Sequence, residues 1–246
     1  MTRATILEET RDGIAVLTMN RPARRNAFND QQYDELRAAL AAAQANDHIR
    51  VVLITGAPGA FSAGQDINEM GSGRQFTPFV DQLAAFDKPL LAAVNGVAVG
   101  VGVTMLLHCD LVYIAQSARL RVPFVALGLV PEAGSTFLLP MVMGAQRAAE
   151  AFFTSGWLDA AVAVEAGLAR RTVADDQLLA VALATAGAMA THPLAALRET
   201  KRLLLAARND ALRAARARED AAQAVRLGSA ENLAAIRAFQ SRRPQA

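Results

Sequence analysis

Residues 89–107 of the chain read PLLAAVNGVAVGVGVTMLL, and this stretch decides the fold. It carries no charged side chain and one strongly polar side chain, Asn95, so by length and composition it could cross a bilayer. Three glycines lie in its middle, however, and each glycine costs about 1 kcal/mol inside a helix. We therefore expect a buried strand over 90–94, a glycine-rich turn and a buried helix ending at His108, rather than a membrane span.

The turn after this strand has the character of an anion-binding loop. Its glycines are Gly96, Gly100 and Gly102, and their spacing does not match the dinucleotide pattern G-x-G-x-x-G. A turn of this kind leaves backbone N–H groups free at the start of a helix, where they can bind an oxyanion or a phosphate.

Alternating strand and helix patterns surround this stretch. They predict an α/β fold with a parallel core. Helical patterns dominate after Gly134, apart from a weak strand signal at 169–173, so we expect a core over 1–190 and a C-terminal helical region over 191–246. The other expected elements are a hairpin of strands 4–9 and 14–19 turning at Asp12-Gly13, a helix with N-cap Asn29 running through Ala43, strands 51–55 and 111–115, and a helix over 76–86.

The composition describes a globular chain. It has 246 residues, of which 53% are hydrophobic and 20% charged, so it can bury a large core. The single cysteine, Cys109, excludes an internal disulfide and fits a reducing compartment. The first residues carry no apolar signal segment, and the three scattered histidines spell out no metal cluster. We expect a cytoplasmic protein without a metal.

The charge is uneven along the chain. The net charge is only +2, but residues 201–246 contain ten Lys or Arg against four Asp or Glu. Such a basic segment can meet nucleic acid, the phosphates of a nucleotide-like ligand or a partner subunit, and it can equally be a solvated helical face.

A second glycine-containing loop follows the buried strand 51–55. In this loop Gly64 precedes Gln65, so the chain can turn sharply and present the Gln65 N–H. Two such loops, each after a buried strand, can aim two N–H donors at one carbonyl oxygen, as an oxyanion hole requires. Ser62 does not fit the nucleophile elbow G-x-S-x-G, because residue 60 is Ala.

These loops and the segments around them resemble the enoyl-CoA hydratase/isomerase (crotonase) superfamily over essentially the whole chain. The matching segments are Asn20-Arg-Pro-Ala-Arg-Arg-Asn-Ala27, Thr55-Gly56, Ala60-Phe-Ser-Ala-Gly-Gln-Asp66, Lys88-Pro89, Ala92-Ala-Val-Asn-Gly96, Cys109-Asp110, Leu127-Gly-Leu-Val-Pro131, Gly134, Ala166-Gly-Leu168, Pro193, Thr200-Lys201, Ala238-Phe239 and Arg242-Arg-Pro244.

The resemblance implies a crotonase-like ββα spiral core with C-terminal helices that assemble a homotrimer or a dimer of trimers. It implies an acyl-CoA thioester as substrate, with coenzyme A as part of that substrate and no separate cofactor. The backbone N–H groups of Gln65 and Val101 would hold the thioester oxygen. The coenzyme A moiety would meet Arg25, Ala27, Ala63, Gly64, Asp66, Ile67 and, from the tail, Arg242 or Arg243.

The departures from the family pattern concern the chemistry. A typical hydratase has two glutamates where this chain has Thr104 and Phe124, and hydration needs both a base and an acid. Glu132 stands instead where hydratases usually have glycine, which resembles the peroxisomal-type Δ3,Δ2-enoyl-CoA isomerases. In that branch this glutamate is the sole acid/base, although a carboxylate near a helix N-terminus is also favoured by the dipole alone.

The sequence thus predicts a Δ3,Δ2-enoyl-CoA isomerase that uses Glu132. The alternatives are an enoyl-CoA hydratase or another crotonase-type reaction, a non-catalytic acyl-CoA-binding protein, and RNA binding by the Arg-rich tail, which the resemblance disfavours.

Overall fold

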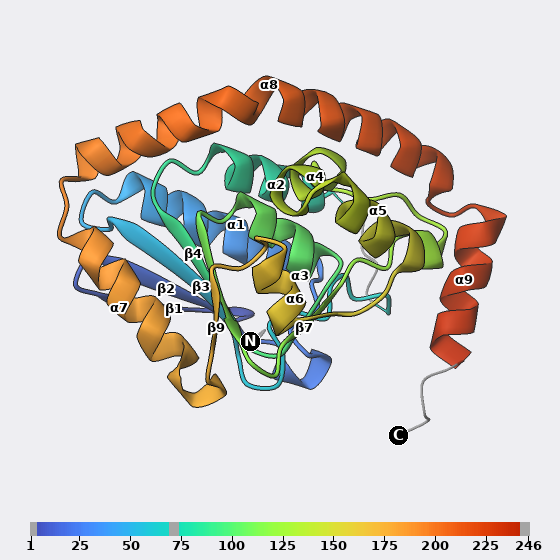
Figure 1. The fold of residues 1–246 in the computed structure, drawn as a ribbon, viewed down its shortest axis with the longest axis horizontal. Helices are drawn as coiled ribbons and strands as arrows, with labels where there is room; N and C mark the ends of the chain where they lie inside the picture. The colour runs from blue at the N-terminus through green and yellow to red at the C-terminus, as the bar shows by residue number, and fades with distance from the viewer. Residues whose placement is uncertain (1–3, 69–73, 242–246) are drawn as a thin grey trace.

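The computed structural model describes residues 4–68 and 74–241 as two β-sheets with surrounding helices (Figure 1). The larger sheet has the strand order β1-β2-β3-β4-β6-β9, and the smaller sheet has the order β5-β7-β8. The strands are β1 (Ile6–Arg11), β2 (Ile14–Met19), β3 (Val51–Gly56), β4 (Leu90–Val94), β5 (Val97–Val99), β6 (Leu111–Ala115), β7 (Arg119–Arg121), β8 (Leu158–Asp159) and β9 (Arg171–Val173).

Helices cover the sheets and form the whole C-terminal part. The α-helices are α1 (Asp30–Ala45), α2 (Phe76–Ala85), α3 (Val101–Thr104), α4 (Ser135–Met143), α5 (Ala145–Thr154), α6 (Ala160–Glu165), α7 (Leu178–Ala190), α8 (Leu194–Arg226) and α9 (Ala230–Ser241). The 3₁₀ turns are η1 (Pro22–Arg24), η2 (Met105–His108), η3 (Val125–Leu127) and η4 (Asp175–Gln177).

The larger sheet confirms the predicted hairpin and parallel core. Strands β1 and β2 pair antiparallel around Asp12 and Gly13, and every later pair in this sheet is parallel. All residues of β3 and β4 are buried, as expected for parallel strands covered on both faces. Helix α7 packs against β3, β4 and β6, while α1 packs against β1 and β2.

The segment 95–102 differs from the expected simple turn. It contains β5, which pairs in parallel with β7, and the helix begins at Val101 and becomes a 3₁₀ turn before His108. The reason is long-range pairing: the Val97 carbonyl accepts hydrogen bonds from Phe61 and Ser62, both at 3.0 Å. Partners this distant in sequence leave no local signal, and β7 and β8 were not expected for the same reason.

The predicted helical C-terminus is confirmed, with one helix much longer than the rest. Helix α8 has 33 residues, which at 1.5 Å per residue is about 50 Å. It arches over α2, α4 and α5, and α9 then turns down the side of the molecule (Figure 1). Among the described helices, none is by itself both long and apolar enough to cross a membrane; only the bent pair Asp175–Ala190 and Leu194–Arg226 passes that test together.

Lys88 anchors the chain just before β4. Its side chain is fully buried, and Nζ donates to three carbonyls in the last turn of α1 and the loop after it: Ala43 (2.7 Å), Asn46 (2.8 Å) and Ile49 (2.7 Å). Burial is the main cause that lowers the pKa of this ammonium. Lys201 of α8 in turn donates to the Lys88 carbonyl at 2.8 Å. The Lys88 side chain thus holds the end of α1, and its carbonyl holds α8.

Replacing Lys88 with methionine should destabilise the protein by about 2–4 kcal/mol, because three carbonyls that are buried or partly buried lose their donor at once. Urea unfolding measures the change. The matched control is Arg202→Met on α8, which removes an exposed ion pair with Glu199 and should change stability little. Equal effects of the two substitutions would contradict the anchoring role.

Candidate active site

Asn26 is a buried residue that holds the segment 20–27 against the loop after β3. Its backbone is left-handed, with φ of 55°, and its side chain is fully buried. Nδ2 donates to the carbonyls of Ala57 (3.0 Å) and Ala60 (2.7 Å), and Oδ1 accepts from the Arg21 N–H (2.9 Å). The segment that begins Asn-Arg-Pro is thereby tied to the loop after β3.

Gly64 brings this loop against the loop that leads into α3. Its φ is +85°, and a Cβ at this position would lie 2.7 Å from the Val99 carbonyl oxygen and 3.8 Å from the Gly100 Cα. Only glycine permits both the conformation and the approach. Gln65 and Val101, one residue further along each loop, therefore belong to segments in contact.

The amides of Gln65 and Val101 are free to bind a ligand. Phe28 donates to the Gly64 carbonyl (2.7 Å), and Asp66 donates to the Phe28 carbonyl (2.8 Å), so the Gln65 N–H points away from this bridge. Val101 is the first residue of α3, where an N–H has no intrahelical acceptor. Neither N–H has an acceptor among the residues that the structure describes.

Glu132 lies in the turn that enters α4. The next two residues, Ala133 and Gly134, have φ of 61° and 77°, and the Ser135 N–H donates to the Glu132 carbonyl at 3.0 Å. The left-handed conformation is unfavourable for alanine, and such backbone strain is concentrated at functional sites. The Glu132 side chain is partly exposed, so a ligand can reach it.

The surroundings of Glu132 favour its protonated form. Burial is the largest cause that raises its carboxyl pKa to about 8, and the charges of Glu219 and Asp220 on α8 add to the effect. A carboxyl group with a pKa near neutrality can both accept and return a proton at physiological pH.

Tyr33 of α1 contacts Gln65 and is affected by the charge of Glu132. Its hydroxyl donates to the Gln65 Oε1 at 2.9 Å. Burial raises the pKa of this phenol well above its ordinary value, and the negative charges of Glu132 and Asp30 raise it further. One side chain therefore touches the Gln65 side chain and lies within electrostatic reach of the Glu132 carboxylate.

No carboxylate stands at the two hydratase positions. Thr104 is fully buried in α3, and its hydroxyl has no partner among the described residues; Phe124 is buried as well. His108, one turn beyond Thr104, donates from Nε2 to the Ala133 carbonyl at 2.9 Å. Burial lowers the pKa of His108 to about 4, so it supports the Glu132 turn as a neutral ring.

The expected coenzyme A residues lie together around the first loop. Ala27 is buried, Ala63 and Ile67 are half-buried, and the Ala63 N–H donates to the Arg25 carbonyl at 2.9 Å. The Asp66 carboxylate is already occupied: Oδ2 pairs with Arg21 at 3.2 Å. Asp66 is therefore placed to shape the loop, while its role toward coenzyme A stays a prediction.

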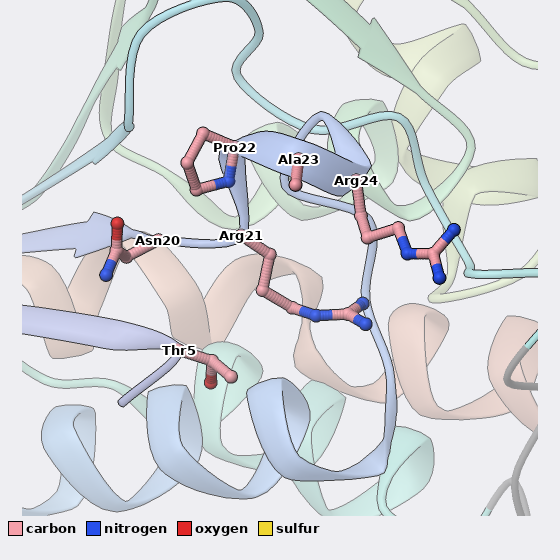
Figure 2. Close-up of a pocket in the computed structure, with 6 residues that line it drawn as sticks. All are labelled: Thr5, Asn20, Arg21, Pro22, Ala23 and Arg24. Atoms are coloured by element: carbon pink, nitrogen blue, oxygen red, sulfur yellow. The ribbon is translucent and has the colours of Figure 1, made fainter. Parts of the chain in front are cut away.

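Two arginines lie exposed beside this loop. Arg24 is the last residue of η1 and Arg25 follows it. A depression of about 200 Å³ lies on this side, lined by Thr5 and residues 20–24. Figure 2 shows the side chains of Arg21 and Arg24 extending in the same direction from the turn. The depression does not include Glu132, and Arg242 lies outside the described residues.

Sequence reasoning missed two residues near Glu132. Tyr33 falls within the helix expected from Asn29 to Ala43, and its hydrogen bond to Gln65 has no local signal in the sequence. Glu219 lies in an Ala- and Arg-rich helix 87 positions after Glu132, where nothing in the pattern distinguishes it from a solvated charge.

The chain matches known proteins over most of its length. The family model described as enoyl-CoA hydratase/isomerase covers residues 9–245. The 1,2-epoxyphenylacetyl-CoA isomerase of Escherichia coli K12 is 39% identical over 201 residues, 76% of this chain and 77% of that protein. The 2,3-dehydroadipyl-CoA hydratase of the same strain is 37% identical over 213 residues, 84% of each. A crystal structure of an enoyl-CoA hydratase/isomerase from Pseudoalteromonas atlantica T6c has a TM-score of 0.94 at 37% identity, covering 98% of both chains.

The paired glycine loops, the two sheets and the helical C-terminus define an α/β enzyme of the crotonase fold. Within this class, the chain belongs to the enoyl-CoA hydratase/isomerase family. An acyl-CoA thioester is consistent with that family. The relatives carry names of isomerases and of hydratases alike, so membership leaves the reaction to be argued from the site.

Gly64→Ala should lower kcat/KM by about 100-fold or more, because a displacement of roughly 1 Å in a binding group can cost that much. The new Cβ would be forced against the Val99 carbonyl. Turnover of an acyl-CoA substrate measures the loss. Gly59→Ala is the matched control, since Gly59 has φ of +106° but open space around it. Activity losses of the same size in both would assign the effect to backbone strain alone.

Glu132→Gln should stabilise the protein increasingly as pH rises from about 5 to about 8. The folded state holds the Glu132 proton up to a pKa of about 8, whereas the ordinary value is 4.5. Between these values the unfolded state binds fewer protons, so the stability of the wild type falls with pH; a glutamine does not titrate. Urea unfolding of both proteins across this range measures the difference, and a difference that does not change with pH would contradict the raised pKa.

Proposed function

We propose that the protein is a Δ3,Δ2-enoyl-CoA isomerase that moves the double bond of a 3-enoyl-CoA to the 2-position. The proposal rests mainly on one observation: Glu132 has a pKa raised to about 8, and its charge acts on Tyr33, whose hydroxyl donates to the side chain of Gln65. The positions of both hydratase glutamates hold Thr104 and Phe124.

The proposed reaction is an allylic proton transfer. The thioester oxygen accepts hydrogen bonds from the N–H groups of Gln65 and Val101, and Glu132 removes a proton from C2. The negative charge then spreads over the dienolate, where those two donors stabilise it. Each such donor contributes about 3–4 kcal/mol in comparable oxyanion holes. The protonated Glu132 returns the proton to C4, which gives the conjugated 2-enoyl-CoA.

One carboxyl group serves both steps, and its raised pKa suits that double role. A carboxylate with an ordinary pKa is a weak base toward C2, whereas one with a much higher pKa would hold the proton too tightly to return it readily to C4. Tyr33 stays protonated because its own pKa is raised, so its hydroxyl remains a donor to Gln65 throughout the reaction.

Hydration is the nearest alternative. It requires water to be activated while a second group protonates C2. Glu219 is the carboxylate whose charge acts most on Glu132, and its oxygens accept hydrogen bonds from Gly134 and Thr136. Because Glu219 is buried and engaged in this way, the site favours a single-carboxylate reaction over hydration.

The basic C-terminal charges are largely used inside the chain. On α8 and just after it, Arg213 pairs with Asp210, Arg216 with Asp81, and Arg226 with Glu231. This pairing disfavours RNA binding as the role of the basic segment. Several apolar side chains of the same region are exposed, and they support the proposal that α8 and α9 form subunit contacts in a trimer. These side chains are Leu203, Leu204, Val225, Leu227, Leu233 and Phe239.

The test is incubation of the protein with a 3-enoyl-CoA in D2O. Conjugated 2-enoyl-CoA should form with deuterium uptake, and Glu132→Gln should lose at least about 10²-fold of the rate, the lower part of the range for acid–base catalysis. Binding of the CoA ester by calorimetry should persist in Glu132→Gln, because glutamine keeps the shape.

Glu165→Gln is the matched control, an exposed glutamate paired with Arg147, and it should keep full activity. Crotonyl-CoA hydration and turnover of 1,2-epoxyphenylacetyl-CoA are measured in parallel. Near-normal isomerisation by Glu132→Gln would overturn the assignment. Hydration without isomerisation would favour the hydratase, and tight binding without any exchange would favour a binding protein.

A further inference from the structure

The C-terminal helices hold the segment that carries Glu132. At its start, Asn232 of α9 donates from Nδ2 to the Leu127 carbonyl at 2.7 Å. In its middle, the Val130 N–H donates to Gln223 Oε1 of α8 at 3.2 Å. The segment therefore takes its position from side chains that come roughly 90 to 105 residues later in the chain.

At the end of this segment, Glu219 of α8 binds the turn itself. Its side chain is buried, and Oε2 accepts from the Gly134 N–H at 2.6 Å. Oε1 accepts from the Thr136 N–H at 2.7 Å and from the Thr136 hydroxyl at 2.5 Å. The N-cap of α4 is Gly134, which has no side chain to satisfy these donors, so a residue of another helix does so.

A charged side chain at position 219 has an energetic cost. Glu219 places a second negative charge near Glu132, and burial raises the pKa of Glu219 itself, while its hydrogen bonds oppose that shift. A neutral acceptor could bind these donors without repelling Glu132. The groups with titratable or charged side chains around the Glu132 turn are Tyr33 on α1, Asp81 on α2, His108 on η2, and Arg216, Glu219 and Asp220 on α8.

We propose that Glu219 is a positioning residue for catalysis: it fixes the turn of Gly134 and Thr136 from α8 and thereby aims the Glu132 carboxyl group at the substrate. The inference rests on the proposed function of Glu132 as the acid/base. It assigns α8 a part in the active site of its own chain. The charge of Glu219 also opposes ionisation of Glu132, so its removal should make Glu132 a stronger acid.

The decisive variant is Glu219→Gln, which removes the charge and leaves only one oxygen for three donors. Isomerisation of a 3-enoyl-CoA should fall about tenfold or more in kcat, because misaligned catalytic groups lose rate steeply. KM should change by less than about threefold, since the amides of Gln65 and Val101 are untouched. The midpoint of the pH dependence of kcat/KM should move to lower pH.

Three control variants separate the effect of the Glu219 charge from the effect of its hydrogen bonds. Asp220→Asn removes an exposed charge on α8 without a hydrogen bond to the turn, so it should move the midpoint slightly and leave kcat unchanged. Asp210→Asn, which removes an exposed charge on α8 that pairs with Arg213, should change neither. Thr136→Val deletes one hydrogen bond at nearly constant volume, and should lower kcat less than Glu219→Gln does.

Titration of the Glu132 carboxyl by carbon-13 NMR supplies a readout that does not need turnover. The Glu132 signal is assigned by its absence in Glu132→Gln, and its midpoint should fall in Glu219→Gln. If the wild type does not isomerise, the proposed function fails, and this titration still tests whether Glu219 controls Glu132. The inference is overturned if both the titration and kcat of Glu219→Gln match those of Asp210→Asn. If Glu219→Gln does not fold, Thr136→Val decides by the same comparison of kcat.

Discussion

The contact between Gly64 and the Val99 carbonyl is the constraint on which the rest of the site depends. It holds two loops from different strands at a separation that no side chain would allow, and it brings the Gln65 and Val101 amides onto adjoining segments. The buried strands β3 and β4 fix where each loop starts, and Asn26 fixes the first loop from its other side. The two amides are thus carried by a rigid core, which is the arrangement that the predicted oxyanion hole would require.

Several features of the site lower the stability of the folded protein. Ala133 is held in a left-handed conformation, Glu132 sits where its charged form is disfavoured, and Glu219 adds a like charge nearby. Each of these features raises the free energy of the folded state by an amount typical of functional sites. The continuous core of the larger sheet and the buried anchor of Lys88 offset these costs.

Sequence alone predicted the features that depend on neighbouring residues. The hairpin at Asp12, the N-cap at Asn29 and the parallel strands around β3 follow from local patterns, and all are confirmed. The strands β5, β7 and β8 escaped prediction because each has three residues or fewer and is stabilised only by partners distant in the chain. The roles suggested for Gln65 and Val101 came from the family resemblance, and they stay predictions.

Glu219 shows why the remainder of the site could not be predicted. Its function depends on where a helix of 33 residues happens to cross the turn of Gly134, and the pattern of a long amphipathic helix is compatible with many such crossings. The turn favours glycine at residue 134 because its φ is +77°, and an added Cβ would also have to displace the end of the Leu212 side chain of α8. Glycine at this position therefore lets α8 pack closely, but it provides no side chain to cap the N-terminus of α4. Glu219 of α8 supplies the missing hydrogen-bond acceptor. The C-terminal region is in this sense part of the active site, and a change in how α8 packs would reach Glu132 through two hydrogen-bonded residues.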